Sequence, residues 1–268
     1  MSKLCVVVPT YNEAENLTRL VGQIEETLDD LNFKLIVVDD GSPDGTARVA
    51  EQLNAVHGNI LVKSRRAKSG LGSAIQVGLR AALEMEDVES VLTLDADLSH
   101  DPGEIPKLLR ASQQVDFVQG SRYVEDGKAI GWGFWRRIVS CVANLVCRML
   151  LRMSVRDCTS NFRVYSRKCA EVIVNSAVQS GFEWVIEALL IAKKYQLAVK
   201  EVPIVFVSRK GGETKLNGKE IVNWAFFAGK NLFSSRQSST VPHQINSPIC
   251  KSSALKVALT APSASTTK

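Results

Sequence analysis

Short apolar runs rich in β-branched residues alternate with helical patterns through the first hundred residues of this 268-residue chain. Runs at 4–8, 34–39 and 91–94 each end in polar turn residues, and residues 14–28 carry apolar side chains at helical spacing. Consecutive parallel strands need a long crossover connection, which is usually a helix. The alternation therefore predicts an α/β fold, in which helices flank a mainly parallel central sheet on both faces.

The strand expected at 91–94 is followed by two carboxylates, Asp95 and Asp97, and then by Ser99 and His100. Burying two like charges is unfavourable unless a cation or hydrogen bonds compensate. In open α/β sheets, ligands bind at the carboxyl ends of the strands, where this pair lies. Two interpretations stay open: an oxygen-ligand site for Mg²⁺ or Mn²⁺, or a turn that Asp97 caps.

Composition excludes several classes of protein. Hydrophobic content of 45% and charged content of 23% are ordinary for a globular chain. Of the net charge of +5, residues 234–268 supply +4, from four basic and no acidic residues. Lys and Arg do not cluster among aromatic residues, so we expect no nucleic acid as a partner.

Cysteine spacing and hydropathy bear on the compartment. The six cysteines form no Cys-x-x-Cys pair, and the strand at 4–8 begins too early for a targeting peptide, so we expect reduced thiols in the cytoplasm. No run approaches the roughly 18 apolar residues of a membrane-spanning helix.

The second half of the chain is expected to contain two unusual helices. Within residues 134–153, five polar residues recur every four positions on an otherwise apolar helix: Arg136, Ser140, Asn144, Arg148 and Arg152. This pattern is typical of a core helix or of a helix in a membrane interface, and both interpretations stay open. Residues 220–233 are dense in aromatic side chains and form a second candidate interfacial helix, and residues 234–268 form a Ser/Thr-rich tail that we expect to be disordered.

Four segments, taken in order, carry a resemblance to a known family. They are residues 9–13 (PTYNE), 38–46 (VDDGSPDGT), 95–97 (DAD) and 120–123 (GSRY). Together they resemble the family 2 glycosyltransferases of the GT-A fold. Residues 157–163, together with Arg209 and residues 212–216, narrow the resemblance to the dolichyl-phosphate (polyprenyl-phosphate) mannosyltransferases.

The resemblance covers about residues 3–233 and implies one GT-A domain, 1–233. Its first part, 1–125, would bind the nucleotide sugar, and its second part, 126–233, would face the acceptor and the membrane. The tail at 234–268 lies outside the resemblance.

The resemblance also implies roles for individual residues. Asp97 would hold the divalent cation, Mg²⁺ or Mn²⁺, with Ser99 as a weaker ligand, and Asp95, Asp97 and Arg122 would be catalytic. Arg136 and Ser140 would bind the acceptor phosphate. The residues implied in donor binding are Pro9, Tyr11, Glu13, Val38, Asp40, Asp95, Ala96, Asp97, Arg122, Arg209 and Lys215.

Three other polar residues are not expected to act in the reaction. We interpret His100 as a turn residue beside the site rather than a base. Glu183 and Glu187 lie in a helical pattern at 182–195 and are predicted to be solvated charges.

The implied reaction is mannosyl transfer from GDP-mannose to dolichyl or another polyprenyl phosphate, with inversion at the anomeric carbon. The expected location is the cytoplasmic face of a membrane, reached through the two unusual helices, a small membrane-anchoring subunit, or both. Glucosyl transfer from UDP-glucose to the same kind of acceptor is one alternative. A catalytically inactive lipid-binding scaffold subunit is another.

Overall fold

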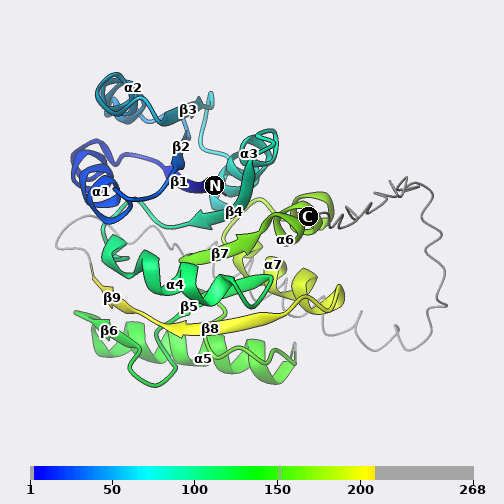
Figure 1. The fold of residues 1–268 in the computed structure, drawn as a ribbon. Helices are drawn as coiled ribbons and strands as arrows, with labels where there is room; N and C mark the ends of the chain where they lie inside the picture. Colours follow the sequence, from blue (N-terminus) through cyan, green and yellow to red (C-terminus); the bar gives the residue numbers. More distant parts are fainter. Residues whose placement is uncertain (1–2, 151, 209–268) are drawn as a thin grey trace, which may run out of the picture.

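The structure is a computed structural model that describes residues 3–150 and 152–208 (Figure 1). The elements of the first half are β1 (Lys3–Thr10), α1 (Ala14–Thr27), β2 (Phe33–Asp39), α2 (Thr46–His57), β3 (Ile60–Ser64), α3 (Leu71–Leu83), β4 (Val88–Thr93), a 3-10 turn η1 (Pro102–Glu104) and α4 (Ile105–Ser112). Those of the second half are β5 (Phe117–Ser121), β6 (Lys128–Ile130), α5 (Phe134–Leu150), β7 (Arg163–Ser166), α6 (Arg167–Ser176), α7 (Trp184–Lys194), β8 (Val199–Pro203) and β9 (Val205–Val207).

Seven strands form the central sheet, in the order β3-β2-β1-β4-β7-β5-β8. All neighbouring strands run parallel except β7, which is antiparallel to both β4 and β5. Strands β6 and β9 form a separate parallel pair. The predicted α/β fold, with a mainly parallel sheet flanked by helices, is confirmed.

Two hydrophobic clusters lie on opposite faces of this sheet because successive side chains of a strand point to opposite sides. On β1, Val6 and Val8 pack with α1, α2 and α4, whereas Cys5 and Val7 pack with α3, α6 and α7. The chain leaves β1 toward β2 and later returns to β4 on the other side of β1. The carboxyl ends of β1 and β4 therefore flank a switch point in strand order, where ligands bind in such sheets.

Helix α5 lies at the base of the view in Figure 1, and two residues of its polar stripe, Ser140 and Asn144, form hydrogen bonds with the rest of the protein. Tyr123 donates from its hydroxyl to Ser140 Oγ at 2.7 Å, and Cys158 N–H donates to Asn144 Oδ1 at 2.7 Å. The outer side is apolar and exposed, at Phe134, Trp135, Ile138, Val139, Val142, Leu145 and Met149. Helix α5 is therefore not a core helix, and the first of the two interpretations of residues 134–153 is wrong.

Helix α7 corrects another expectation. Glu183 and Glu187 are 9% and 7% exposed, so neither is a solvated charge. The Glu187 carboxylate accepts backbone N–H bonds from Val178 and Gln179, which fastens the loop between α6 and α7. Burial raises the pKa of Glu187, although these hydrogen bonds act in the opposite direction.

The expectations for 220–233 and for the tail at 234–268 concern residues outside the described part of the chain. Within residues 3–150 and 152–208, no helix has the length and hydropathy needed to cross a bilayer.

Candidate active site

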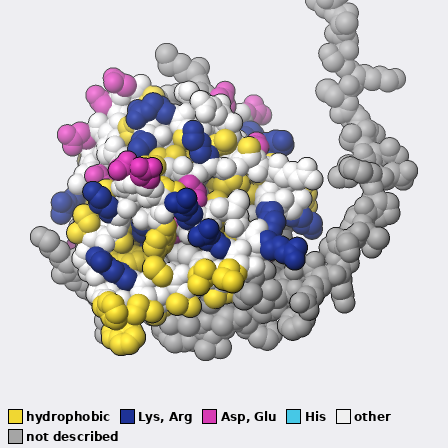
Figure 2. Space-filling view, turned by 90° about the horizontal axis from the view of Figure 1, so that it is seen from below, with side chains coloured by type: hydrophobic (Ala, Val, Ile, Leu, Met, Phe, Trp, Pro, Cys, Tyr) yellow, Lys and Arg dark blue, Asp and Glu magenta, His cyan; other side chains and the backbone are white. Residues whose placement is uncertain are grey.

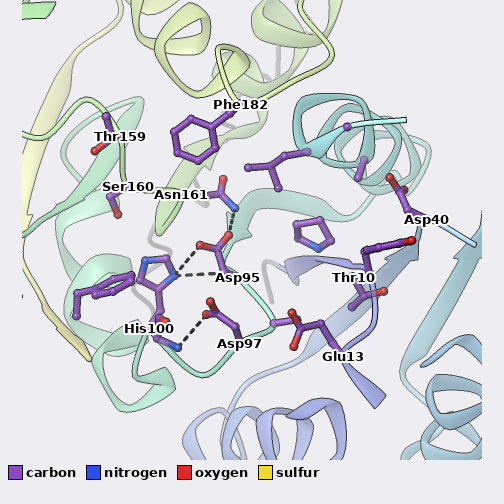
Figure 3. Close-up of a pocket in the computed structure, with 18 of the residues that line it drawn as sticks. Thr10, Glu13, Asp40, Asp95, Asp97, His100, Thr159, Ser160, Asn161 and Phe182 are labelled. Atoms are coloured by element: carbon purple, nitrogen blue, oxygen red, sulfur yellow. Dashed lines mark hydrogen bonds and ion pairs between the residues drawn. The ribbon is translucent and has the colours of Figure 1, made fainter. Parts of the chain in front are cut away.

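A cavity of about 260 Å³ opens at the carboxyl ends of β1, β2 and β4. Its other walls come from the segment before β7, from Lys68 and the N-terminal turn of α3, from Arg122 and Arg136, and from Phe182 and Phe206. In Figure 3, Asp95, Asp97 and His100 lie on the side of the cavity opposite Asp40 and Thr10. The switch point therefore brings together side chains that are far apart in the sequence.

Most of the residues predicted for the site line this cavity: Pro9, Tyr11, Glu13, Asp40, Asp95, Ala96, Asp97, Ser99, Arg122 and Arg136. Two do not. Val38 is fully buried in the core, and Ser140 accepts the hydrogen bond from Tyr123 behind the cavity wall. Arg209 and Lys215 lie outside the described residues.

Asp95 and Asp97 are held differently. The Asp95 carboxylate accepts from Asn161 Nδ2 at 3.0 Å, and its backbone N–H donates to His100 Nδ1 at 3.4 Å. Asp97 Oδ1 accepts the backbone N–H of Ser99 at 3.1 Å, as an aspartate does in a tight turn. The expected turn is therefore present at Asp97. The position of the Asp97 carboxylate in the cavity also suits a ligand of a divalent cation.

His100 is 1% exposed, and its ring stacks on Phe162 with centroids 5.1 Å apart. Burial lowers its pKa, although the carboxylates of Asp95 and Asp97 pull in the opposite direction. Nδ1 lies 3.4 Å from the Asp95 backbone nitrogen and 3.8 Å from Asp95 Oδ2, whereas Nε2 has no hydrogen-bond partner among the described residues. A neutral imidazole engaged in this way supports the turn and is a poor general base.

Arg122 is paired with a buried carboxylate, Asp157. Its Nε and Nη2 donate to the two carboxylate oxygens of Asp157, each at 2.7 Å, and Nη2 also donates to Thr159 Oγ1. Burial opposes the charged guanidinium, but the Asp157 charge outweighs it and raises the pKa of Arg122. Burial likewise disfavours the charged form of Asp157, yet the charge and hydrogen bonds of Arg122 lower the pKa of Asp157. The pair is ionised, and Arg122 brings less net charge to the cavity than a lone arginine.

Asp40 also has protein partners, at the carboxyl end of β2. It forms an ion pair with Arg65 and accepts the backbone N–H of Ser69 at 3.1 Å. The same loop carries Lys68, whose Nζ lies 4.6 Å from the centroid of the Tyr11 ring. An aromatic face beside a cation and carboxylates suits a nucleobase with its ribose.

Arg136 reaches the opposite side of the cavity from the first turn of α5. Its guanidinium lies 4.8 Å from the centroid of the Trp132 ring, and Arg122 lies 4.9 Å from the same ring. The Trp132 ring thus forms a cation–π contact with each of the two arginines. The Arg136 charge at this edge suits an anionic group.

The donor set fits a divalent cation only in part. The described residues contain no group of three or more His, Cys, Asp or Glu side chains arranged around a metal. Asp97 and Asp95 are hard oxygen donors, and Mg²⁺ commonly takes one or two carboxylates and completes its coordination with substrate phosphates and water. Such a site would form when a diphosphate binds.

Several lining residues were not predicted from the sequence. Thr159, Ser160 and Asn161 precede β7, while Lys68, Phe182 and Phe206 come from three other segments. The segment 157–163 was part of the resemblance, so it was the one available signal for three of them. The others have no local pattern that separates them from ordinary loop or core residues.

Comparison with known proteins places the chain in a family. Residues 5–174 match glycosyl transferase family 2. The chain is 34% identical over 217 residues to an undecaprenyl-phosphate mannosyltransferase of Micrococcus luteus, covering 81% of this chain and 88% of that protein. It is 38% identical over 219 residues to a polyprenol monophosphomannose synthase of Mycolicibacterium smegmatis, covering 81% and 82%.

A dolichol-phosphate mannosyltransferase of Pyrococcus furiosus is 37% identical over 225 residues, which cover 83% of this chain and 61% of the archaeal protein. Among solved structures, a glucosyl-3-phosphoglycerate synthase from Mycobacterium tuberculosis, in complex with Mn²⁺, UDP and glucosyl-3-phosphoglycerate, superposes with a TM-score of 0.63 at 20% identity. The match covers 87% of this chain and 79% of that one, and it shows the fold, as expected for GT-A. The chain belongs to glycosyl transferase family 2.

Proposed function

We propose that this protein transfers mannose from GDP-mannose to the phosphate of a dolichyl or other polyprenyl phosphate, with inversion. The names of the relatives support mannose and a polyprenyl phosphate. The guanine nucleotide is what the narrower resemblance implies, through residues 157–163 and Arg209 with residues 212–216. The division into a donor-binding part at 1–125 and an acceptor-facing part at 126–233 belongs to the same proposal.

One observation carries the proposal: helix α5 contributes to the cavity and to an apolar surface at once. Arg136, on its first turn, lines the cavity that also contains Asp95 and Asp97. The other side of the same helix exposes apolar side chains, such as Trp135 at 76% and Met149 at 68%. A lipid whose phosphate entered the cavity would keep its chain beside this surface.

The reaction needs cationic positioning more than it needs a base. The phosphate of a polyprenyl phosphate has a second pKa of about 6, so near neutral pH its oxygen is already a nucleophile. That oxygen would form a bond to the anomeric carbon, and the bond from this carbon to the nucleotide phosphate would break. The electron pair would leave with GDP. Arg136 would orient the acceptor phosphate for in-line attack.

A divalent cation, Mg²⁺ or Mn²⁺, would stabilise the negative charge that develops on the leaving diphosphate. Asp97 is the residue proposed to hold it, with Ser99 as a second oxygen and Asp95 beside them. Tyr11 and Glu13 are proposed to contact the base and ribose, with Asp40 shaping that side through its pair with Arg65.

The exposed side of α5 supports a site of action at a membrane surface. This helix carries Arg136, Arg137 and Arg148 and no acidic residue. In Figure 2, which shows the molecule from below, apolar side chains on this face lie among Lys and Arg side chains. Apolar burial with nearby cations favours binding to anionic lipid surfaces. We propose peripheral binding at the cytoplasmic face, with room for a small membrane-anchoring subunit.

A donor and acceptor screen tests the proposal. Purified protein with Mn²⁺ or Mg²⁺ is offered GDP-mannose or UDP-glucose, and a short-chain polyprenyl phosphate as acceptor. We expect a mannosyl phosphate lipid whose anomeric configuration is opposite to that of the donor. Preference for UDP-glucose would favour the glucosyl alternative, and lipid binding without turnover with any donor would favour the inactive scaffold.

A further inference from the structure

The antiparallel strand β7 brings an asparagine opposite the first carboxylate of the pair. In the register of β4 and β7, Thr93 pairs with Arg163. Two residues further, Asp95 follows β4 and Asn161 precedes β7, so the two face each other where the ladder ends. Thr93 Oγ1 donates to the backbone carbonyl of Asn161 at 2.8 Å, which fixes the height of Asn161 along the sheet.

The Asn161 side chain is committed to Asp95. It is 2% exposed, and its Nδ2 donates to Asp95 Oδ1 at 3.0 Å, as the dashed line in Figure 3 shows. The amide must present its nitrogen here, because its oxygen would repel the carboxylate. Asn161 Oδ1 has no hydrogen-bond partner among the described residues. An asparagine needed only for folding would be expected to use both ends of its amide.

Asp95 is thus held at two points. Its backbone N–H is fixed by His100 Nδ1 at 3.4 Å, and its side chain is fixed by Asn161. The carboxylate keeps 34% of its surface exposed, so it still faces the cavity. Asp97, two residues on, accepts the backbone N–H of Ser99 within its own turn. Asn161 therefore acts on one member of the pair and not on the other.

We propose that Asn161 is a positioning residue that holds the Asp95 carboxylate in its productive orientation. The inference rests on the proposed function, because it assumes that Asp95 faces the donor during transfer. A carboxylate locked before the substrate binds does not lose side-chain freedom at the moment of reaction. The hydrogen bond joins residues 66 positions apart, so it exists only because β7 is inserted beside β4.

The test compares two substitutions of Asn161. Asn161→Ala removes the donor, and we expect transfer to fall about tenfold, mainly in kcat, since the bond is to a charged group. Asn161→Asp keeps the shape of the side chain but places a carboxylate against Asp95. We expect it to be worse than Asn161→Ala. The matched control is Asn175→Asp, the same change on an exposed position of α6, which should leave kcat and KM unchanged.

A role in packing alone predicts that each variant loses turnover only as far as it loses folded protein, because a second carboxylate buried beside Asp95 also destabilises the fold. Turnover per folded protein equal to that of the wild type in either variant would overturn the proposal. Crystal structures of the wild type and Asn161→Ala give a readout independent of activity, and we expect the Asp95 carboxylate to move. If no lipid phosphate is mannosylated but the carboxylate moves, the proposed function fails and the positioning role stands. If it does not move, the positioning role fails.

Discussion

The ion pair between Arg122 and Asp157 dominates the energetics of single residues in the site. Asp157 is fully buried and Arg122 is 8% exposed. Asp157→Asn would leave a buried guanidinium without its counter-charge, so we expect the free energy of unfolding to fall by about 3–5 kcal/mol. Urea denaturation measures this loss. The exposed Glu125→Gln, on the same loop as Arg122, should change stability little.

The same pair predicts a pH dependence of stability. The pKa of Asp157 is lowered in the folded protein, so across the interval between its folded and unfolded values the unfolded chain binds more protons. Its contribution is therefore complete above the unfolded pKa of about 3.9 and is lost as the pH falls toward the folded value. Denaturation between pH 6 and 3 should show a smaller loss of stability in Asp157→Asn. Identical slopes would contradict this.

Asp97 allows a test of the proposed metal site at the same scale. Asp97→Asn removes one negative charge from the cavity. We expect transfer to fall at least about 100-fold at any Mn²⁺ concentration tested, because the cation that would stabilise the leaving diphosphate loses its carboxylate ligand. The melting temperature should stay close to that of the wild type. Asp29→Asn, at an exposed position, is the control. Full turnover of Asp97→Asn with metal present would remove Asp97 from the site.

Residues that follow strands with a clear apolar pattern were predictable, and their partners were not. Asp95 and Asp97 come directly after the run at 91–94, so their place at the end of β4 follows from the sequence. Asn161 and Lys68 reach the cavity through contacts between distant segments, and no periodicity reports those. His100 was interpreted as a turn residue beside the site, which agrees with its contacts, but its full burial was not predicted.

At the level of elements, the outer side of α5 can be tested by mutation. Replacing Trp135 and Val142 by Gln removes apolar surface that is already exposed in the protein, so stability should change little. Binding to vesicles with anionic lipids should fall at least about tenfold, because each apolar side chain transferred from water contributes about 1.5–3 kcal/mol. Co-sedimentation measures it. The control is Val56→Gln on α2, where the side chain is 77% exposed.

Strand β7 shows where prediction of elements stops. It has four residues, RVYS. The first, Arg163, is fully buried, and its guanidinium carbon lies 5.3 Å from the centroid of the Phe117 ring. A short segment that begins with an arginine does not have the pattern of a central strand. The apolar run at 202–207 predicts a single strand, but the structure has two strands there, β8 and β9, separated at Ile204. Longer elements with regular periodicity, such as α1, were predicted within one residue.

At the level of the whole molecule, thiol labelling reports the integrity of the hydrophobic cluster between the sheet and helices α3, α6 and α7. Among the cysteines of the described part, Cys141 is exposed, and the others are buried: Cys5, Cys147, Cys158 and Cys169. Burial raises the pKa of Cys5 to about 12, and also raises that of Cys169. Iodoacetamide at pH 8 should therefore alkylate Cys141 rapidly and the buried thiols only after unfolding, as read by peptide mass spectrometry. Rapid labelling of Cys5 in the native protein would contradict the fold.

Under the proposed function, the outward apolar side of α5 also determines which concentration governs turnover. A protein that is bound to a bilayer takes its lipid substrate from the membrane surface, and therefore searches for it in two dimensions. Its rate then follows the mole fraction of acceptor within the membrane and not the amount per volume of solution. Adding vesicles of inert lipid at a fixed total amount of acceptor should slow the reaction by surface dilution, while the dependence on the water-soluble donor stays unchanged.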